Sequence, residues 1–372
     1  MSTEESTSRR RWLQITGGAI VGVAVGAVAG YLGAPKAPAE VVTKTVEKTV
    51  TITPPPTTPK PTPGKIRVAG MTDCVRDDRS WGQTHYECMK RLTEKYPNVE
   101  ISYAESVPWA DIEKLYRDYA EEGYQVVGWW GFQGAEPCLA VAPSYADTQF
   151  YFTCVTKHGP NALSLVYLEE EEGFLSGILA GLLTKTNIVG VYIGTDSPCG
   201  NAYANAYEIG AKLMNADVKC LKAYAGSWTD PAKGKETALA LFDAGADFLG
   251  KYSAMSDIGG FEACKERNVY TTGIYLDQSP FAPDQVPVSF TFHPDVLLEK
   301  MVKNTLEGYP PMGGEWSCGF APMFYSYKRV QRHPAFDKLP SSVQEKFNTF
   351  TSDIEVGRFI PVRDESRFAV SV

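Results

Sequence analysis

The chain has 372 residues, of which 44% are hydrophobic and 22% are charged, and this balance excludes a disordered or fibrous protein. Its length suffices for two domains with additional segments. The formal net charge is -8, and a basic cluster occurs only at the extreme N-terminus. Because proteins that bind nucleic acids carry a concentrated basic surface, the sequence argues against a nucleic-acid partner.

The first segment, residues 1–34, has the pattern of an export signal or membrane anchor. Arg9–Arg11 precede the uncharged residues 12–34, which as a helix would extend about 34 Å, enough to cross a bilayer. The paired arginines and the glycine-rich apolar stretch resemble a twin-arginine signal, and a plain signal-anchor helix is the alternative. Both alternatives predict an extracytoplasmic protein at the cell surface, tethered by this helix or secreted after its cleavage.

Residues 35–64 form a linker that ends in "TITPPPTTPKPTPG". A run so rich in proline and threonine cannot build a core, and we expect it to be extended and solvated. The folded part is therefore predicted to begin at residue 65. It contains all eight cysteines, at positions 74, 88, 138, 154, 199, 220, 264 and 318.

The cysteines show no C-x-x-C pair and no cluster with histidine, which argues against a structural zinc site and against thioredoxin-like chemistry. Some could form disulfides outside the cell, but eight cysteines allow 105 complete pairings and the sequence does not select one. We expect neither a metal ion nor an organic cofactor.

From residue 65 onward, short β-rich runs alternate with amphipathic helical stretches, which is typical of parallel α/β domains. Two consecutive series predict two open sheets side by side. Strands are expected over residues 65–71, 99–105, 124–130, 149–155, 187–194, 218–226, 246–252, 269–276 and 286–292. Helices are expected over residues 80–95, 111–122, 135–145, 170–184, 201–214, 258–267, 295–308 and 341–354, and after Pro231.

Aromatic side chains gather at the predicted carboxyl ends of these strands, where open parallel sheets bind ligands. In "AGSWTDPAKGKE", Trp228 lies on a turn just before Asp230, the expected N-cap of the next helix. Stacking on a ring is worth about 1–3 kcal/mol per contact, so the pattern predicts a site for a planar solute. Trp129 and Trp130 face opposite sides of the pleat, and only one is a candidate. The strand-end candidates are Asp73, Ser80, Trp81, Trp130, Cys154, Thr195, Trp228 and Asp277.

Signatures of catalysis and of nucleotide binding are missing from the sequence. The four histidines are scattered, and neither a G-x-S-x-G nor an H-E-x-x-H motif occurs. No phosphate-binding glycine loop follows a predicted strand. The run Glu169–Glu172 begins a predicted helix, where acidic residues favour the positive end of the dipole, and we expect it to be solvated.

Several blocks of the sequence resemble the basic membrane protein family, the purine-nucleoside receptors of ABC transporters. The blocks are "DDRSWGQTHYE", "EEGFLSGILAGLLTKTNIVGVYIG", "NAYANAYEIGAKLMN", "GSWTDPAKGKETALALFDAGAD" and "YLDQSPFAP", which lie within residues 66–310. The resemblance implies the type I periplasmic binding protein fold, in which two α/β lobes close around a solute. It implies a first lobe of residues 65–165 and 287–310, and a second lobe of residues 166–286 and 311–372.

The resemblance also implies roles for individual residues. Trp81 and Trp228 would supply one ring from each lobe, and Asn205, Asp277 and Asp73 would form hydrogen bonds to the solute. Two positions depart from the family pattern: Gly82 stands where asparagine is usual, and Tyr275 stands where many nucleoside receptors have a second aspartate.

These departures leave a free base or another flat solute open as alternatives to a nucleoside. The expected function is that of a binding protein, monomeric in its soluble part, which delivers its solute to an ABC permease. A ligand-sensing receptor of the same fold and an exported nucleoside-processing enzyme are the alternatives.

Overall fold

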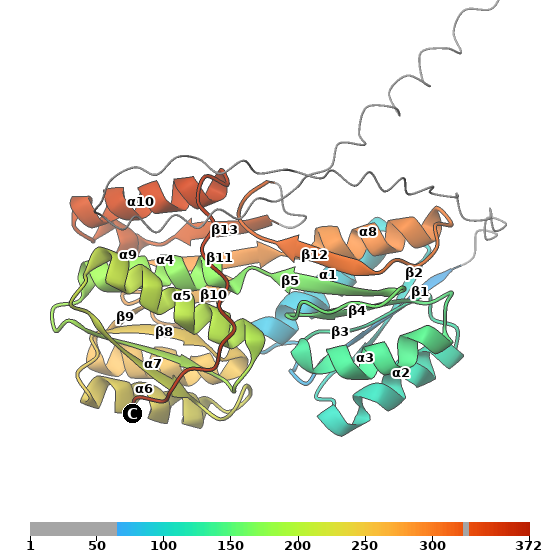
Figure 1. Ribbon diagram of the computed structural model, residues 1–372, viewed down its shortest axis with the longest axis horizontal. Coiled ribbons are helices and arrows are strands. Elements are labelled where there is room, and N and C mark those ends of the chain that lie inside the picture. Colours follow the sequence, from blue (N-terminus) through green and yellow to red (C-terminus); the bar gives the residue numbers. More distant parts are fainter. Residues whose placement is uncertain (1–64, 323–326) are drawn as a thin grey trace, which may run out of the picture. The chain divides into compact units, whose positions relative to one another are not determined.

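The computed structural model describes residues 65–322 and 327–372, all of which belong to one compact unit (Figure 1). The predicted signal or anchor segment (1–34) and the proline- and threonine-rich linker (35–64) lie outside the described residues. Within the described ranges, no helix has both the length and the apolar character needed to span a bilayer.

The first lobe is a six-stranded parallel sheet in the order β12-β5-β4-β3-β1-β2, with helices on both faces (Figure 1). Helices α1 and α8 pack on one face, and α2 and α3 cover the other. Because both faces are covered, its inner strands are almost continuously apolar. The strands are β1 (Ile66–Met71), β2 (Val99–Ala104), β3 (Val126–Trp129), β4 (Gln149–Thr153), β5 (Ala162–Tyr167) and β12 (Gly314–Cys318); the helices are α1 (Trp81–Lys95), α2 (Ile112–Glu121), α3 (Ala135–Val141) and α8 (Asp295–Leu306).

The second lobe has a four-stranded parallel sheet, β7-β6-β8-β9, and a three-stranded sheet, β10-β11-β13, in which β13 is antiparallel. Only Thr272 separates β9 from β10, so one extended segment joins the two sheets. The strands are β6 (Ile188–Ile193), β7 (Lys219–Tyr224), β8 (Phe248–Tyr252), β9 (Tyr270–Thr271), β10 (Gly273–Tyr275), β11 (Val288–His293) and β13 (Tyr327–Arg332); the helices are α4 (Glu169–Leu183), α5 (Pro198–Met214), α6 (Pro231–Asp243), α7 (Asp257–Arg267), α9 (Pro334–Asp337) and α10 (Ser341–Glu355).

The chain passes between the lobes three times: between β5 and α4, between β11 and α8, and between β12 and β13. The observed strand pairing differs from the predicted lobe boundaries at two places. Strand β11 was expected in the first lobe but pairs with β10 and β13, and β12 was expected in the second lobe but pairs with β5. Pairing with β12 satisfies backbone groups that β5 would otherwise expose at the sheet edge.

The predicted helix start at Asp230 is confirmed. Its side chain accepts hydrogen bonds from the backbone N–H groups of Ala232 and Lys233, and Pro231 occupies the first helical position. The cap therefore fixes the backbone immediately after Trp228.

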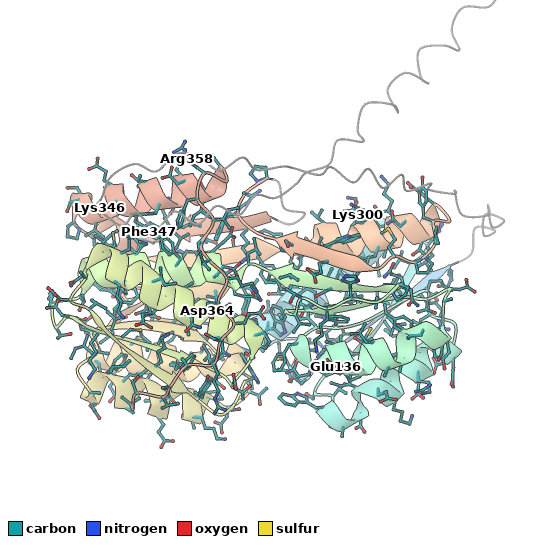
Figure 2. All side chains as sticks on the ribbon, in the orientation of Figure 1. Glu136, Lys300, Lys346, Phe347, Arg358 and Asp364 are labelled. Atoms are coloured by element: carbon teal, nitrogen blue, oxygen red, sulfur yellow. The ribbon has the colours of Figure 1, made fainter. Side chains whose placement is uncertain are left out.

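Exposed charged side chains of both signs project from the outer helices, as Glu136 on α3 and Lys346 on α10 do in Figure 2, and Arg358 follows the end of α10. The eight cysteines, all within the described residues, are free thiols, and seven of them are buried.

Helices α4 and α5 pack backbone to backbone along a ridge of glycines. Gly173, Gly177 and Gly181 recur every four residues on α4, and a Cβ atom at Gly177 would lie 2.0 Å from the Tyr207 carbonyl oxygen. A side chain at this position would force the two helices apart. The glycines therefore set the close approach of α4 and α5.

We expect Gly177→Ala to lower the free energy of unfolding by about 1–3 kcal/mol, because the added methyl group overpacks this contact. Leu213→Ala is the control, since Leu213 lies on α5 with 54% of its surface exposed and should change stability by less than about 0.5 kcal/mol. Urea unfolding followed by circular dichroism measures both changes. Equal stability of the two variants would contradict this account of the ridge.

Candidate functional site

A cavity lies where the carboxyl ends of the strands in the two lobes meet. Its volume is about 30 Å³. The cavity therefore has the position at which open parallel sheets bind ligands. Its lining residues are Asp73, Cys74, Trp81, Gly131, Phe132, Gln133 and Cys154 from the first lobe, and Cys199, Trp228, Tyr252, Ala254 and Tyr275 from the second.

Asp78 holds the loop that presents Trp81. Its carboxylate accepts hydrogen bonds from the backbone N–H groups of Ser80 (2.8 Å), Gly82 (2.8 Å) and Gln83 (3.0 Å), and it thereby caps α1 in place of the Ser80 side chain. A Cβ atom at Gly82 would lie 2.3 Å from the Val75 carbonyl oxygen. This close approach explains why glycine stands where asparagine is usual.

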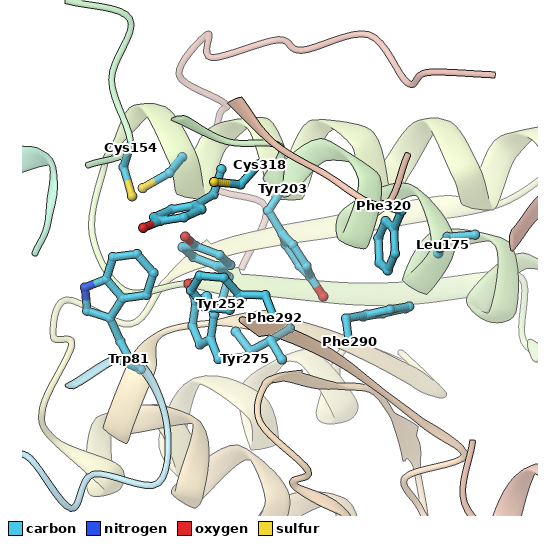
Figure 3. Close-up of a cluster of buried hydrophobic side chains, with 14 of the residues drawn as sticks. Trp81, Cys154, Leu175, Tyr203, Tyr252, Tyr275, Phe290, Phe292, Cys318 and Phe320 are labelled. Carbon is cyan, nitrogen blue, oxygen red and sulfur yellow. The ribbon is translucent and has the colours of Figure 1, made fainter. Parts of the chain in front are cut away.

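Trp81 packs among aromatic rings from both lobes, as Figure 3 shows for Tyr275 and Phe292. Its centroid lies 5.0 Å from that of Trp130 and 5.0 Å from that of Tyr275 in the opposite lobe. The indole N–H donates to the Trp130 carbonyl oxygen at 3.0 Å. One hydrogen bond and several ring contacts therefore fix the indole with 7% of the residue exposed.

Trp228 lies in the second lobe and is partly exposed. Its indole N–H donates to Thr195 Oγ1 at 2.9 Å, and Phe132 of the first lobe approaches it with ring centroids 6.4 Å apart. A Cβ atom at Gly194 would lie 2.4 Å from the indole ring, so the absence of a side chain there makes room for it. The turn therefore presents the Trp228 ring to the cavity.

Asp73 and Gln133 form the polar edge of the cavity. The Asp73 carboxylate accepts hydrogen bonds from Trp109 Nε1 at 2.7 Å and from Gln133 Nε2 at 3.2 Å. Burial raises the pKa of the Asp73 carboxyl above its ordinary value, although the hydrogen bond from Trp109 opposes that shift. These two side chains provide both a hydrogen-bond acceptor and a donor beside the rings.

Backbone strain concentrates at the cavity. Cys154, Ala254 and Tyr275 all line it, and their φ angles of 72°, 50° and 68° lie in the left-handed region that these residue types rarely adopt. Such conformations persist where the surrounding structure determines the direction of a side chain, and they cluster at ligand sites. The strain therefore marks the cavity as a candidate site independently of its aromatic lining.

Of the nine candidates, Asp73, Trp81, Cys154 and Trp228 line the cavity, whereas Ser80, Trp130, Thr195, Asn205 and Asp277 do not. Ser80 is buried behind Trp81, and its hydroxyl has no partner among the described residues. Trp130 lies beneath Trp81 and stacks on His85, with ring centroids 4.3 Å apart.

Asn205 and Asp277 lie elsewhere because each has a local structural partner. The Asn205 side chain donates to the carbonyl oxygens of Asp364 and Ser366, and it holds the C-terminal segment against α5. Asp277 is exposed, and its carboxylate accepts hydrogen bonds from Ser279 and Gln331.

The sequence interpretation did not single out Phe132, Gln133 or Tyr252 as site residues. Phe132 and Gln133 directly follow the expected strand 124–130, and Tyr252 is the last residue of the expected strand 246–252. The same strand-end rule that selected Trp228 could therefore have found them. Ala254 and Cys199 carry no comparable signal in the sequence.

His85 is buried beneath the aromatic rings, where it stacks on Trp130, and its role is structural. Its Nε2 lies 2.9 Å from the Tyr151 hydroxyl, and burial lowers its pKa to about 3. The ring therefore stays neutral and does not provide a general acid or base at neutral pH.

The prediction that Glu169–Glu172 are solvated is wrong. All four are at most 2% exposed at the start of α4, where the chain enters the second lobe. Arg363 Nη1 lies 2.8 Å from Glu169 and 2.7 Å from Glu170, and Lys328 Nζ lies 3.2 Å from Glu172. These two cations come from the C-terminal segments that return to this lobe, and the sequence pattern around the glutamates gives no sign of them.

Residues 65–321 match the family model described as ABC transporter substrate-binding protein PnrA-like, which covers well over half of the chain. The chain belongs to this family. The family consists of substrate-binding proteins rather than enzymes, which confirms the expectation of a binding function. The resemblance to basic membrane proteins is likewise confirmed.

Several relatives align at similar identity. Basic membrane protein A of Borreliella afzelii is 26% identical over 68% of this chain and 79% of its own length. A relative from Haloferax volcanii, described as a glucose-binding protein of an ABC transporter, is 25% identical over 57% of this chain and 54% of its own. The nucleoside-binding protein BmpA of Lactococcus lactis is 27% identical over 57% of this chain and 64% of its own.

The fold is also that of solved binding proteins. An ABC transporter solute-binding protein from Aeropyrum pernix superimposes with a TM-score of 0.70 and 20% identity, covering 80% of this chain and 94% of that one. This similarity confirms the expected α/β architecture with parallel sheets.

The buried glutamates predict how stability depends on pH. Burial raises the pKa of Glu171 to about 8, while the nearby Lys328 opposes that shift. The folded state thus retains a proton that the unfolded chain releases above about pH 4.3, so this contribution to stability is lost as the pH rises toward 8. We expect Glu171→Gln to flatten the decline between about pH 5 and pH 8 by up to about 1.4 kcal/mol per pH unit.

Denaturant unfolding at a series of pH values measures this dependence, and Glu345→Gln, at an exposed position on α10, is the control. If the free energy of unfolding of both variants declines with pH as steeply as that of the unmodified protein, Glu171 does not bind that proton.

Proposed function

We propose that this protein is an extracytoplasmic receptor of an ABC importer and binds a purine nucleoside, or a related flat solute, in the cavity between its lobes. The observation that carries the proposal is the aromatic lining, to which both lobes contribute at their strand ends. Trp81 and Phe132 come from the first lobe, and Trp228, Tyr252 and Tyr275 come from the second. Rings on two sides suit a planar ligand better than a globular one.

The energetics of stacking agree with this assignment. Two stacking contacts supply about 2–6 kcal/mol, whereas a micromolar affinity requires about 8 kcal/mol. Hydrogen bonds from Asp73 and Gln133 can supply the remainder, because both lie at the edge of the rings.

The charge of the lining restricts the class of solute. Among the described residues that line the cavity there is neither lysine nor arginine. Phosphorylated solutes are usually held by such cations, which form charge-assisted hydrogen bonds to phosphate oxygens. An uncharged nucleoside or base therefore fits better than a nucleotide.

The size of the cavity requires a movement of the lobes. The 30 Å³ open to water-sized molecules is too small for a nucleoside, and the direct contact of Trp81 with Tyr275 spans the two lobes. We infer that the rings separate to admit the solute and close on both of its faces. Closed lobes would then present a joint surface to the permease.

Mass spectrometry of small molecules that copurify with the full chain identifies the solute without prior assumption. Calorimetry with inosine, adenosine, adenine and glucose then ranks the candidates, since relatives are described as nucleoside-binding and as glucose-binding. Binding of glucose but of no purine would overturn the assignment of a flat solute.

We expect Trp228→Ala to weaken purine binding at least about fivefold, corresponding to the loss of about 1 kcal/mol of stacking. Gly194→Val should have the same effect without removing the ring, because the new side chain displaces the indole. Tyr309→Ala is the control, since Tyr309 is 60% exposed and lies outside the cavity. Calorimetry measures the affinities, and circular dichroism shows that each variant folds. An unchanged affinity in both cavity variants would place the solute elsewhere.

A further inference from the structure

Two cysteines and a glutamate from distant parts of the sequence meet at the inner end of the cavity. The ligand atoms of Cys154, Glu169 and Cys199 all lie within 4.8 Å of one another, and each residue is at most 2% exposed. Cys154 follows β4 in the first lobe, whereas Glu169 begins α4 and Cys199 lies in the first turn of α5 in the second. The cluster therefore bridges the two lobes (Figure 3 shows Cys154 beside the aromatic rings).

The donor atoms of this cluster are suited to a thiophilic cation. Two sulfur ligands and one carboxylate oxygen match the preferences of Zn²⁺ and its softer analogue Cd²⁺, and hard cations such as Mg²⁺ prefer oxygen alone. Glu169 Oε2 is engaged by Arg363 at 2.8 Å. Its Oε1 accepts only a long contact of 3.5 Å from the Tyr252 hydroxyl, which leaves lone pairs on that oxygen for a cation.

Cys154 and Cys199 both belong to the lining of the cavity. Three protein ligands would leave a fourth tetrahedral position for water or a solute atom. The left-handed backbone of Cys154, with φ of 72°, is a further sign that the direction of this side chain is determined by its surroundings.

We propose that Cys154, Cys199 and Glu169 form a binding site for one thiophilic divalent cation at the boundary of the lobes. Each thiol releases its proton to the solvent as its sulfur binds the cation, so two protons leave for each cation bound. Burial, together with the adjacent Cys199 and Glu169, raises the pKa of the Cys154 thiol well above its ordinary value.

A cation at this site would hold the lobes together, since its ligands come from both of them. Binding that requires the closed arrangement stabilises that arrangement by mass action. The inference does not depend on the identity of the organic solute, because the three ligands belong to the protein alone.

The test uses the full chain, reduced and kept free of oxygen, with Cd²⁺ alone as the probe. We expect one Cd²⁺ per chain by calorimetry, together with the ultraviolet charge-transfer absorption of cadmium thiolate. Cys154→Ser, Cys199→Ser and Glu169→Gln should each weaken binding, the two cysteine variants by more than about 100-fold.

The matched control is Cys74→Ser. Cys74 lines the same cavity, but its thiol contacts Asp73 at 3.6 Å and lies outside the cluster, so Cd²⁺ binding should be unchanged. Thermal unfolding without metal shows whether each variant folds. If either Cys154→Ser or Cys199→Ser fails to fold, the other variant still tests the site.

Absence of the charge-transfer absorption in the reduced, folded chain would overturn the proposal, as would equal Cd²⁺ binding by the Cys154 and Cys74 variants.

Chain purified without reductant is compared by non-reducing mass spectrometry. A Cys154–Cys199 disulfide whose reduction fails to restore Cd²⁺ binding would also overturn the proposal, because the pair would then be a redox pair only. Restored binding after reduction supports the cation site. Loss of purine binding with Cd²⁺ binding retained would affect only the proposed function.

Discussion

The junction of the lobes depends on one requirement: the charge of the buried carboxylates at the start of α4 must be neutralised. Four consecutive glutamates enter the second lobe with no more than 2% exposure, and ionised carboxylates in such a place need partners. Arg363 pairs with Glu169 and Glu170 and Lys328 pairs with Glu172, from segments more than 150 residues further along the chain. Glu171 instead retains its proton and accepts a hydrogen bond from the Phe320 backbone N–H. The C-terminal part of the chain is therefore needed to complete the junction, and β12, β13 and the last segment return to it.

The junction brings the carboxyl ends of two parallel sheets to one place, and the local backbone then directs the side chains found there. The Asp78 carboxylate caps the loop before Trp81, the Asp230 cap fixes the backbone after Trp228, and Gly194 leaves room for the indole. Cys154, Ala254 and Tyr275 take left-handed conformations around the same cavity. Aromatic rings from both lobes thus meet without being neighbours in sequence.

Much of the fold could be predicted because regular hydrophobic patterns and capping residues are local signals. The helix starting at Pro231 and most strands agree with the pattern. Strands β5, β12 and β13 were missed because they lie in irregular sequence and gain their stability from pairing with other strands. At the site, Asp73, Trp81 and Trp228 could be found because each follows a recognisable strand. The contacts of Asn205 and Asp277, and the burial of the glutamates, could not be predicted because their partners, such as Asp364, Gln331 and Arg363, are distant in sequence.

The small volume enclosed by both lobes has a kinetic consequence. With a volume of about 30 Å³, the cavity cannot hold a solute the size of a nucleoside while the rings stay in place. Exchange would then be limited by the frequency with which the lobes part, and contacts to a captured solute would lengthen its dwell time by lowering that frequency. Chemically different solutes would share similar rates of capture and differ chiefly in how long they delay reopening.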